Sequence, residues 1–249
     1  MIQIEKLPTA PPPGTDREAL AAETKRMAKR LANLQEVMRA EGKYSMLVIL
    51  QGMDASGKDG AVKNVFKYCS HLGIHSHSFK KPSKEEAAHD FLWRAHKITP
   101  RKGEIAVWNR SHYEDVLIQR VHGWIDEERV QKRFAAINAF EDLLHFDNET
   151  IIFKFFLNLS YDQQEIELRE RIDEREKNYK YNPGDWAERE HWDTYMKCYE
   201  DVLNQCNLIP WTVVPVDKRW YRNFVILKAI TEKLETLNME YPVPEDLPQ

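Results

Sequence analysis

The chain predicts an α/β fold in which a parallel five-stranded sheet lies between two layers of helices. Short apolar segments alternate with longer helical patterns from residue 46 to about residue 237. Such alternation is typical of a parallel sheet that is covered on both faces. The first apolar segment, Met46–Gln51, is almost uniformly apolar, as expected of a strand buried on both sides. Because a core of this size usually belongs to one domain, we expect residues 16–249 to form a single domain.

An arm and a helix are expected before the first strand. Residues 1–15 include Pro8, Pro11, Pro12 and Pro13, which favours an extended arm. From Asp16 to about Glu41, leucine and methionine recur at spacings of three to four residues among charged residues, and this pattern predicts a helix. Gly42 is expected to end that helix as a C-terminal cap.

The remaining strands and helices follow from the same patterns. The five expected strands are Met46–Gln51, Ile74–Phe79, Glu104–Trp108, Thr150–Leu157 and Trp211–Val216. The expected helices after the first strand are Asp59–Ser70, Lys84–His96, Tyr113–Val121, Asp126–Asp147, Asp162–Glu176, Asp185–Gln205 and Trp220–Leu237. Tyr241–Gln249 contains prolines and acidic residues and is expected to fray.

One stretch, residues 162–199, is densely charged and is broken by Asn182-Pro183-Gly184. Two charged helices joined by a turn would form a lid that projects from the sheet. The alternative is a pair of solvated surface helices.

Composition and charge exclude several classes of protein. The net charge is −4, so an anionic ligand must be held by local basic clusters, which argues against a protein that coats nucleic acid. The apolar runs are too short to cross a membrane, and the N-terminus lacks the order of a signal peptide. Cys69, Cys198 and Cys206 show no metal-ligand spacing. We therefore expect a cytoplasmic protein with reduced thiols, and neither a membrane nor nucleic acid as its partner.

The strongest motif is the Gly-x4-Gly-Lys spacing of Gly52–Lys58, between an apolar strand and a helical pattern. In this context the backbone N–H groups of the loop converge on phosphate oxygens, and Lys58 reaches a bridging or terminal phosphate. An ordinary strand-to-helix turn is the alternative. The residues of this segment expected to contact phosphate, besides Lys58, are Gly52, Ala55, Ser56, Gly57, Asp59 and Gly60.

Two carboxylates in this motif predict a metal ion. Asp54 lies inside the loop, and Asp59 occupies the position after Lys58 where a hydroxyl is usual. A carboxylate beside a phosphate is repulsive, and a divalent cation between them removes the conflict. We therefore expect Mg²⁺, with Mn²⁺ as the alternative ion. The alternatives for the side chains themselves are a turn residue at Asp54 and a helix cap at Asp59.

A second group of polar residues follows the strand that ends near Trp108. The carboxyl ends of parallel strands are where such sheets bind ligands. Asn109 could orient a metal-bound water, and Arg110 could stabilise charge on a phosphoryl group. Asp115 could supply a carboxylate to the metal. Arg110 and Asp115 in structural ion pairs are the alternative, and His112 is more readily explained as a packed histidine.

Basic residues form a third group. Lys80 and Lys81 follow the second strand, with Lys84 and Arg94 after them. If these side chains converge with those of the lid, they form a phosphate channel. If they do not converge, they are solvated charges. The lid cations are Arg169, Arg171, Arg175, Lys177 and Lys180.

Taken in this order, the motifs resemble the second polyphosphate kinase family. The likeness covers Gly52–Gly60, Phe79–Ser83, Phe91–Arg94 and Gly103–Tyr113 and continues through Glu170–Ile172, Asp185, Glu188-Arg189, Trp192–Tyr195, Pro210-Trp211, Trp220 and Arg222. It implies a three-layer α/β/α P-loop kinase fold with a helical lid. It also implies reversible transfer of the terminal phosphoryl group of inorganic polyphosphate to a nucleoside mono- or diphosphate.

The resemblance also assigns roles to residues. Asp54 and Asp115 would hold Mg²⁺, Lys58 and Arg110 would contact the transferring phosphate, and Arg171 would come from the lid. The lid residue Arg175 and the basic pair Lys80 and Lys81 would bind polyphosphate. Asn109, Arg110 and Glu114 would bind the nucleotide, and a glutamate at Glu114 resembles the subgroup that acts on both AMP and ADP. GMP and GDP are further candidate acceptors, and relatives tend to form homodimers or homotetramers.

Two segments depart from the family pattern. Gln164–Leu168 carries fewer arginines than its relatives, and Gln205–Ile209 replaces a threonine-rich loop. The alternatives to a polyphosphate-dependent enzyme are an ATP-dependent nucleoside monophosphate kinase and a P-loop ATPase that binds nucleic acid.

Overall fold

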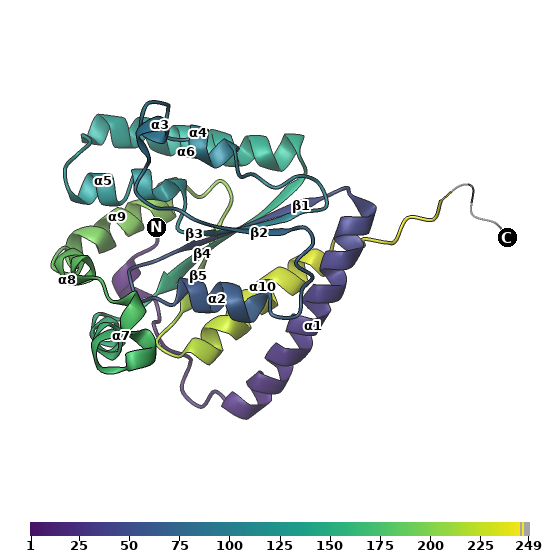
Figure 1. Cartoon of the computed structure of the whole chain (residues 1–249), viewed down its shortest axis with the longest axis horizontal. Coiled ribbons are helices and arrows are strands. Elements are labelled where there is room, and N and C mark those ends of the chain that lie inside the picture. The colour runs from purple at the N-terminus through teal and green to yellow at the C-terminus, as the bar shows by residue number, and fades with distance from the viewer. Residues whose placement is uncertain (245, 247–249) are drawn as a thin grey trace.

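The computed structural model describes residues 1–244 and 246 and contains the expected five-stranded parallel sheet. The strands lie in the spatial order β2-β3-β1-β4-β5, with parallel pairing between all neighbours (Figure 1). Every predicted strand boundary lies within one residue of the observed one, so these predictions are confirmed. The strands are β1 Ser45–Gln51, β2 Ile74–Ser78, β3 Ile105–Asn109, β4 Thr150–Asn158 and β5 Trp211–Pro215.

Helices cover both faces of the sheet. The α-helices are α1 Arg17–Glu41, α2 Lys58–Val65, α3 Lys84–Ala87, α4 Trp93–His96, α5 Ile118–Val121, α6 Glu127–Asp147, α7 Tyr161–Asp173, α8 Pro183–Arg189, α9 Trp192–Gln205 and α10 Arg219–Glu235. The 3-10 helices are η1 Ile4–Lys6, η2 His112–Asp115 and η3 Arg175–Lys180. Helices α1, α2 and α10 lie on one side of the sheet, and α6 lies on the other (Figure 1).

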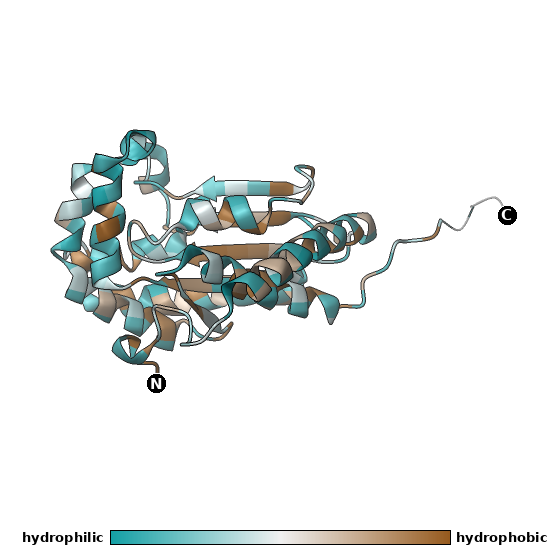
Figure 2. Cartoon of the chain, turned by 90° about the horizontal axis from the view of Figure 1, so that it is seen from below, coloured by the Kyte–Doolittle hydropathy of each residue, from teal (hydrophilic) through white to brown (hydrophobic). Residues whose placement is uncertain are grey.

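The alternation of side chains along β1 explains the three layers. Leu47 and Ile49 belong to the core shared with α6 and α9, whereas Met46, Val48 and Leu50 belong to the core shared with α1, α2 and α10. Successive residues of a strand point to opposite faces, so one uniformly apolar segment serves both cores. Figure 2 shows hydrophobic central strands between helices that carry many hydrophilic residues, whereas the edge strand β2 is largely hydrophilic.

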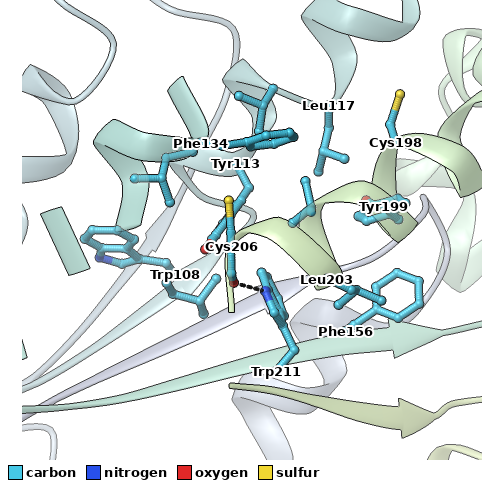
Figure 3. Close-up of a cluster of buried hydrophobic side chains, with 14 of the residues drawn as sticks. Trp108, Tyr113, Leu117, Phe134, Phe156, Cys198, Tyr199, Leu203, Cys206 and Trp211 are labelled. Atoms are coloured by element: carbon cyan, nitrogen blue, oxygen red, sulfur yellow. Dashed lines mark hydrogen bonds between the residues drawn. The ribbon is translucent and has the colours of Figure 1, made fainter. Parts of the chain in front are cut away.

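Aromatic side chains fill the core beneath α6 and α9. Trp108 of β3, Phe156 of β4 and Trp211 of β5 are buried there with Phe134 and Tyr199 from the helices (Figure 3). The indole Nε1 of Trp211 donates to the carbonyl oxygen of Cys206 at 2.9 Å, so its polar atom is satisfied inside the core. The tryptophans of β3 and β5 thus hold the sheet against this helix layer.

Both ends of α1 are set by capping residues that flank the helix in the sequence. The Asp16 carboxylate accepts hydrogen bonds from the N–H groups of Glu18 and Ala19, which satisfies the first turn. At the other end Gly42 has a φ of 63°, a left-handed conformation that glycine adopts without steric cost. The predicted cap at Gly42 is confirmed.

Three long helix predictions are wrong because local turns interrupt them. The predicted helix Lys84–His96 breaks into α3 and α4 where the Asp90 carboxylate accepts the N–H of Leu92 at 3.0 Å, a turn that competes with the helix. The predicted helix Tyr113–Val121 divides into η2 and α5. The predicted helix Asp185–Gln205 also divides, and its first part begins at Pro183 rather than Asp185, since proline is favoured in the first turn of a helix.

The first residues of the chain pack against the domain rather than projecting from it. Ile4 is buried, and its N–H donates to Glu200 on α9 at 2.8 Å. Asn158 at the end of β4 donates to the carbonyl oxygens of Leu7 and Pro8. The expected extended arm is therefore, in part, a strap across α9 and the end of β4. Of the tail expected to fray, residues 245 and 247–249 lie outside the described residues.

A buried ion pair links the sheet to α6. The Nζ of Lys154 on β4 lies 2.7 Å from the Glu141 carboxylate, and both side chains are fully buried. The same Nζ donates to the Tyr113 hydroxyl oxygen at 3.0 Å and to the Cys206 carbonyl oxygen at 2.8 Å. The Tyr113 hydroxyl donates to the other oxygen of Glu141 at 2.7 Å. Each charge is thus hydrogen-bonded as well as paired, which a buried pair requires.

Replacing Lys154 with methionine leaves the Glu141 carboxylate buried without its counter-charge. We expect Lys154→Met to lower the free energy of unfolding by about 3–5 kcal/mol in urea denaturation. Lys132→Met is the control, because Lys132 pairs with Glu128 on the exposed surface of α6, and its effect should stay within about 0.5 kcal/mol. Similar losses in the two variants would contradict this account of the buried pair.

Candidate active site

The loop between β1 and α2 is shaped by glycines that admit no side chain. Gly57 has a φ of 82°, and a Cβ there would lie 2.2 Å from Arg222 Nη1. At Gly52 a Cβ would lie 2.7 Å from the carbonyl oxygen of Leu157 on β4. The loop is therefore held between β4 and α10, and its N–H groups stand at the N-terminus of α2, where anions bind favourably. This is the strand, loop and helix context that the motif predicted.

Lys58, the first residue of α2, is turned back toward this loop. Its Nζ donates to the carbonyl oxygens of Gly52 at 2.8 Å and Met53 at 3.0 Å. The side chain is buried, and burial, assisted by the charge of Arg110, lowers the pKa of its ammonium group to about 8. A buried ammonium group held in this way is oriented before any phosphate reaches it.

Asp54 and Arg110 form an ion pair across the carboxyl ends of β1 and β3. Arg110 has a φ of 59°, a left-handed conformation that is strained for a residue with a side chain and that often marks functional sites. Burial raises the pKa of the Asp54 carboxyl, but the charges of Arg110 and Lys58 outweigh this effect and lower it overall. Burial disfavours the charge of Arg110, and Glu114 and Asp54 reverse this, so that its pKa is raised. Both groups are therefore charged.

A cavity of about 630 Å³ opens on one side of this ion pair. Its lining carries more cationic than anionic side chains, although the whole chain is negatively charged. The cationic residues are Lys58, Arg110, Arg171, Lys177, Lys180, Arg219 and Arg222, and the carboxylates are Asp54, Asp59 and Glu167. The negative net charge predicted that an anionic ligand would need a local basic cluster, and such a cluster is present here.

Cations reach this cavity from separate parts of the chain. Arg171, at the end of α7, pairs with Asp185 of α8, and Lys180 Nζ lies 3.8 Å from the Asp59 carboxylate. Arg222 of α10 is buried and donates to the carbonyl oxygen of Gly57 at 2.9 Å. Sequence reasoning missed Arg219 and gave Arg222 no role. Their position just after β5 was the available signal, because the carboxyl ends of parallel strands share one edge of the sheet.

A second cavity of about 210 Å³ adjoins the first. Both are lined by Asp54 and Arg110, so the ion pair stands at their junction. The smaller cavity has a different character, with carboxylates from Glu114, Asp185 and Glu188 and rings from Tyr195 and Tyr199. Its other lining residues are Gly52, Met53, Ile118, Asn182 and Gly184.

Side chains around the smaller cavity are fixed by hydrogen bonds. The Gln51 amide nitrogen donates to the Glu114 carboxylate at 3.1 Å, and the Tyr195 hydroxyl donates to Glu188 at 2.6 Å. Asn109 instead faces the larger cavity, where its amide nitrogen donates to Asp59. Of the three residues expected to bind a nucleotide, Arg110 and Glu114 thus meet in the smaller cavity, and Asn109 does not line it.

Several expected site residues lie elsewhere. Lys80 and Lys81 are exposed, and neither they nor Arg175 line either cavity. Ser56 is buried and also lines neither cavity; its Oγ accepts from Lys58 Nζ at 3.4 Å. The cations that line the larger cavity therefore come from η3 and α10, with Arg171, and not from the lysines that follow β2.

Asp115 also lines neither cavity. Its carboxylate is buried and lies 2.8 Å from Arg94 Nη2, and its backbone carbonyl oxygen accepts from Arg133 at 2.6 Å. Arg94 donates in addition to the carbonyl oxygen of Lys80 at 2.9 Å. The geometry matches the structural ion pair weighed against a metal role, with Arg94 as the partner. This partner was not foreseen, because Arg94 lies on a different helix.

These features agree with comparisons to known proteins. A sequence model of the polyphosphate kinase 2 family matches residues 14–242. The chain belongs to this family. It is 44% identical over 92% of its length to the AMP/ADP-polyphosphate phosphotransferase of Meiothermus ruber, covering 84% of that protein. It is 40% identical over 86% of its length to the ADP-polyphosphate phosphotransferase of Rhodopseudomonas palustris, covering 78% of that protein.

A solved structure from the same family has the same fold. The crystal structure of polyphosphate kinase 2 from Arthrobacter aurescens TC1 superposes with a TM-score of 0.88 at 37% sequence identity. The match covers 99% of this chain and 94% of that structure. The predicted three-layer polyphosphate kinase fold is therefore confirmed.

The donor atoms of this family member suit a hard divalent cation. Among the described residues, no group of three or more His, Cys, Asp and Glu side chains is arranged to hold a metal ion. Mg²⁺ in phosphoryl-transfer enzymes usually takes one or two carboxylates and completes its shell with phosphate oxygens and water. Asp54, whose carboxylate stands at the junction of the two cavities, fits that requirement.

The charged segment 162–199 contacts the loop between β1 and α2 directly. Gln164 of α7 is buried, and its amide nitrogen donates to the carbonyl oxygen of Asp54 at 3.0 Å. Its amide oxygen accepts from Arg189 of α8 at 2.9 Å. Gln164 thus connects α7 and α8 to the loop between β1 and α2.

The position of Asp115 leads to a stability prediction. Asp115→Asn removes the charge that compensates the buried Arg94 guanidinium, so the free energy of unfolding should fall by about 3–5 kcal/mol. Urea denaturation measures this loss. The matched control is Asp59→Asn, since the Asp59 carboxylate is largely exposed and its loss should cost less than about 1 kcal/mol. Unchanged stability in Asp115→Asn would show that the Arg94 pair is not structural.

Proposed function

We propose that this protein transfers the terminal phosphoryl group of inorganic polyphosphate to AMP and ADP, reversibly and with Mg²⁺. The observation that carries the proposal is the junction of two unlike cavities at Asp54 and Arg110. One cavity is cationic and suits a polyanion, and the other offers carboxylates and tyrosines that suit a nucleotide. Phosphoryl transfer needs its donor and acceptor to meet at one charged position. The names of the relatives from M. ruber and R. palustris support the choice of substrates.

Polyphosphate is assigned to the larger cavity. Arginine and lysine together bind phosphate chains well, since guanidinium groups grip two oxygens at once and ammonium groups act as point charges. Arg171 of α7, Lys180 of η3 and Arg222 of α10 all line this space. The end of the chain that reacts would lie over the loop, within reach of Lys58 and Arg110.

The nucleotide is assigned to the smaller cavity. Its phosphate would face Arg110, while the carboxylates of Glu114 and Glu188 can accept hydrogen bonds from amino and hydroxyl groups of a nucleoside. Tyr195 and Tyr199 add aromatic surface for a base. AMP and ADP are the proposed acceptors, and GMP and GDP belong in the same assays.

The reaction exchanges one phosphoanhydride bond for another. A terminal phosphate oxygen of the nucleotide attacks the terminal phosphorus of polyphosphate, and the bond to the next phosphate breaks. The products are a nucleotide longer by one phosphate and a chain shorter by one. Arg110 and Lys58 stabilise the negative charge of the group in transfer. Mg²⁺, held by Asp54 and by Asp115 if that side chain leaves Arg94, would neutralise phosphate charge and orient the donor.

The charged segment 162–199 is proposed as the lid of this site. Helices α7 and α8, with η3, contribute Arg171, Lys177 and Lys180 to the larger cavity and Asp185 to the smaller one. Closure of such a segment over bound substrates would exclude water, which limits hydrolysis of the phosphoryl group.

In this proposal residues 1–15 are the arm and residues 16–249 are the kinase domain. The protein is proposed to be a cytoplasmic homodimer or homotetramer that does not bind nucleic acid. Within the part of the chain that is described, none of the helices is both long and apolar enough to span a membrane.

The proposal is tested by product analysis without ATP. With polyphosphate, Mg²⁺ and AMP, the purified protein should form ADP and then ATP. AMP that stays unchanged with polyphosphate but is phosphorylated by added ATP would identify an ATP-dependent monophosphate kinase instead. Lys58→Ala and Asp54→Asn should lower kcat by at least about 10²–10³-fold, since each removes a charge at the transfer position. Near-normal turnover in either folded variant would contradict the site assignment.

The buried Lys58 predicts the response to pH. Its pKa is lowered to about 8 mainly by burial and by Arg110, against the opposing charges of Asp54, Glu114 and Asp59. Phosphate binding needs the protonated ammonium group, so kcat/KM for polyphosphate should fall as the pH rises through about 8. Lys58→Arg, whose guanidinium group stays charged, should move this fall to higher pH in any activity that remains. A profile that is flat from pH 7 to about 9.5 would contradict the role of Lys58.

A further inference from the structure

An acidic side chain lies inside the cationic cavity without an evident role in transfer. Glu167 is the one carboxylate that α7 contributes to its lining among the described residues, and the guanidinium of Arg171, four residues later, lines the same space. Residues four apart lie on the same face of a helix, so one face of α7 presents opposite charges to the cavity. A carboxylate there repels any polyanion that enters.

Glu167 is paired with a cation of the same cavity. Its carboxylate contacts Arg219 Nη2 at the start of α10, and Arg219 also lines the cavity. Glu170, one turn later on α7, lies 3.3 Å from the same nitrogen and 2.6 Å from Lys177 Nζ. The described contacts of Glu167 include neither Lys58 nor Arg110, and its nearest other partner is Gln163.

We propose that Glu167 competes with polyphosphate for Arg219 and thereby sets the affinity for the donor. This inference rests on the proposed function and assigns a specificity role within the same cavity. Arg219 can bind a phosphate of the chain only when that phosphate displaces the carboxylate. Because Glu167 does not contact the residues at the transfer position, it affects donor binding and leaves the chemical step unchanged.

The charge of Glu167 also affects the buried Arg222. Burial and the neighbouring charge of Arg219 lower the pKa of Arg222 to about 10, and Glu167 opposes this change. Arg222 holds the carbonyl oxygen of Gly57 at 2.9 Å. Removing the carboxylate therefore leaves a cluster of cations whose mutual repulsion is relieved best by a bound polyanion, which strengthens donor binding.

The test is a steady-state comparison of donor and acceptor kinetics. Glu167→Gln keeps the size of the side chain and should lower the KM for polyphosphate by roughly threefold to tenfold. The kcat and the KM for AMP should not change. The KM for polyphosphate should also rise more steeply with salt in the variant, since one more protein cation then engages the polyanion. Because Glu170 can retain Arg219, the variant Glu167→Gln/Glu170→Gln is measured as well.

Two controls separate this role from a general effect of charge. Glu128→Gln makes the same change in net charge on the exposed surface of α6, where Glu128 pairs with Lys132, and should leave the KM for polyphosphate unchanged. Arg219→Gln should raise that KM. In the Arg219→Gln background, Glu167→Gln should give a much smaller decrease, because the competition requires Arg219 and only the direct repulsion of the polyanion is then removed.

The outcomes distinguish this inference from the proposed function. A KM for polyphosphate that stays unchanged or rises in both glutamate variants overturns the role of Glu167, while turnover of polyphosphate by the wild-type protein leaves the proposed function intact. A full decrease that persists without Arg219 overturns the competition. Absence of any turnover with polyphosphate in the wild type overturns the proposed function and this inference together.

Discussion

The organisation of the site depends on the ion pair between Asp54 and Arg110. The two residues come from loops after neighbouring strands, and their side chains meet where the two cavities join. Arg110 has a left-handed backbone conformation, a strain that the surrounding structure must offset. Helix α7 also touches this point, through the bond from Gln164 to the Asp54 carbonyl oxygen. A change in this ion pair would thus affect the loop, both cavities and α7.

The charge around the larger cavity is opposite in sign to the net charge of the chain. The chain as a whole is negative, yet cations from η3 and α10, with Arg171 at the end of α7, converge on one cavity. Desolvation there makes each charge depend on its neighbours, as the lowered pKa values of Lys58 and Arg222 show. The carboxylates of Asp59 and Glu167 moderate this repulsion. A polyanion could therefore be attracted locally without the protein becoming a general binder of nucleic acid.

The sequence predicted the loop after β1 but not all of the residues that line the two cavities, for a physical reason. Gly52–Lys58 could be located because its geometry is encoded by adjacent residues. Asp115 was expected to hold the metal because it follows Asn109 by six residues at the start of a predicted helix and because the family resemblance gives it that role. The structure shows that its carboxylate is paired with Arg94, which lies on another helix. The position of Arg219 just after the last strand was a signal for the site, but Arg219 was given no role from the sequence. Whether such side chains enter a cavity depends on the packing of helices that are distant in sequence.

By itself the sequence determined the five strands, the parallel class of the sheet and the glycine-containing loop between β1 and α2. Those features follow from apolar periodicity, from glycine positions and from the fixed geometry of strand-to-helix turns, all of which act over a few residues. Tertiary structure alone decided that Lys80 and Lys81 stay outside while Arg219 and Arg222 line the cavity. It also decided that the carboxylate of Asp115 pairs with Arg94. These outcomes depend on burial and on charge pairing between distant segments, which no local pattern encodes.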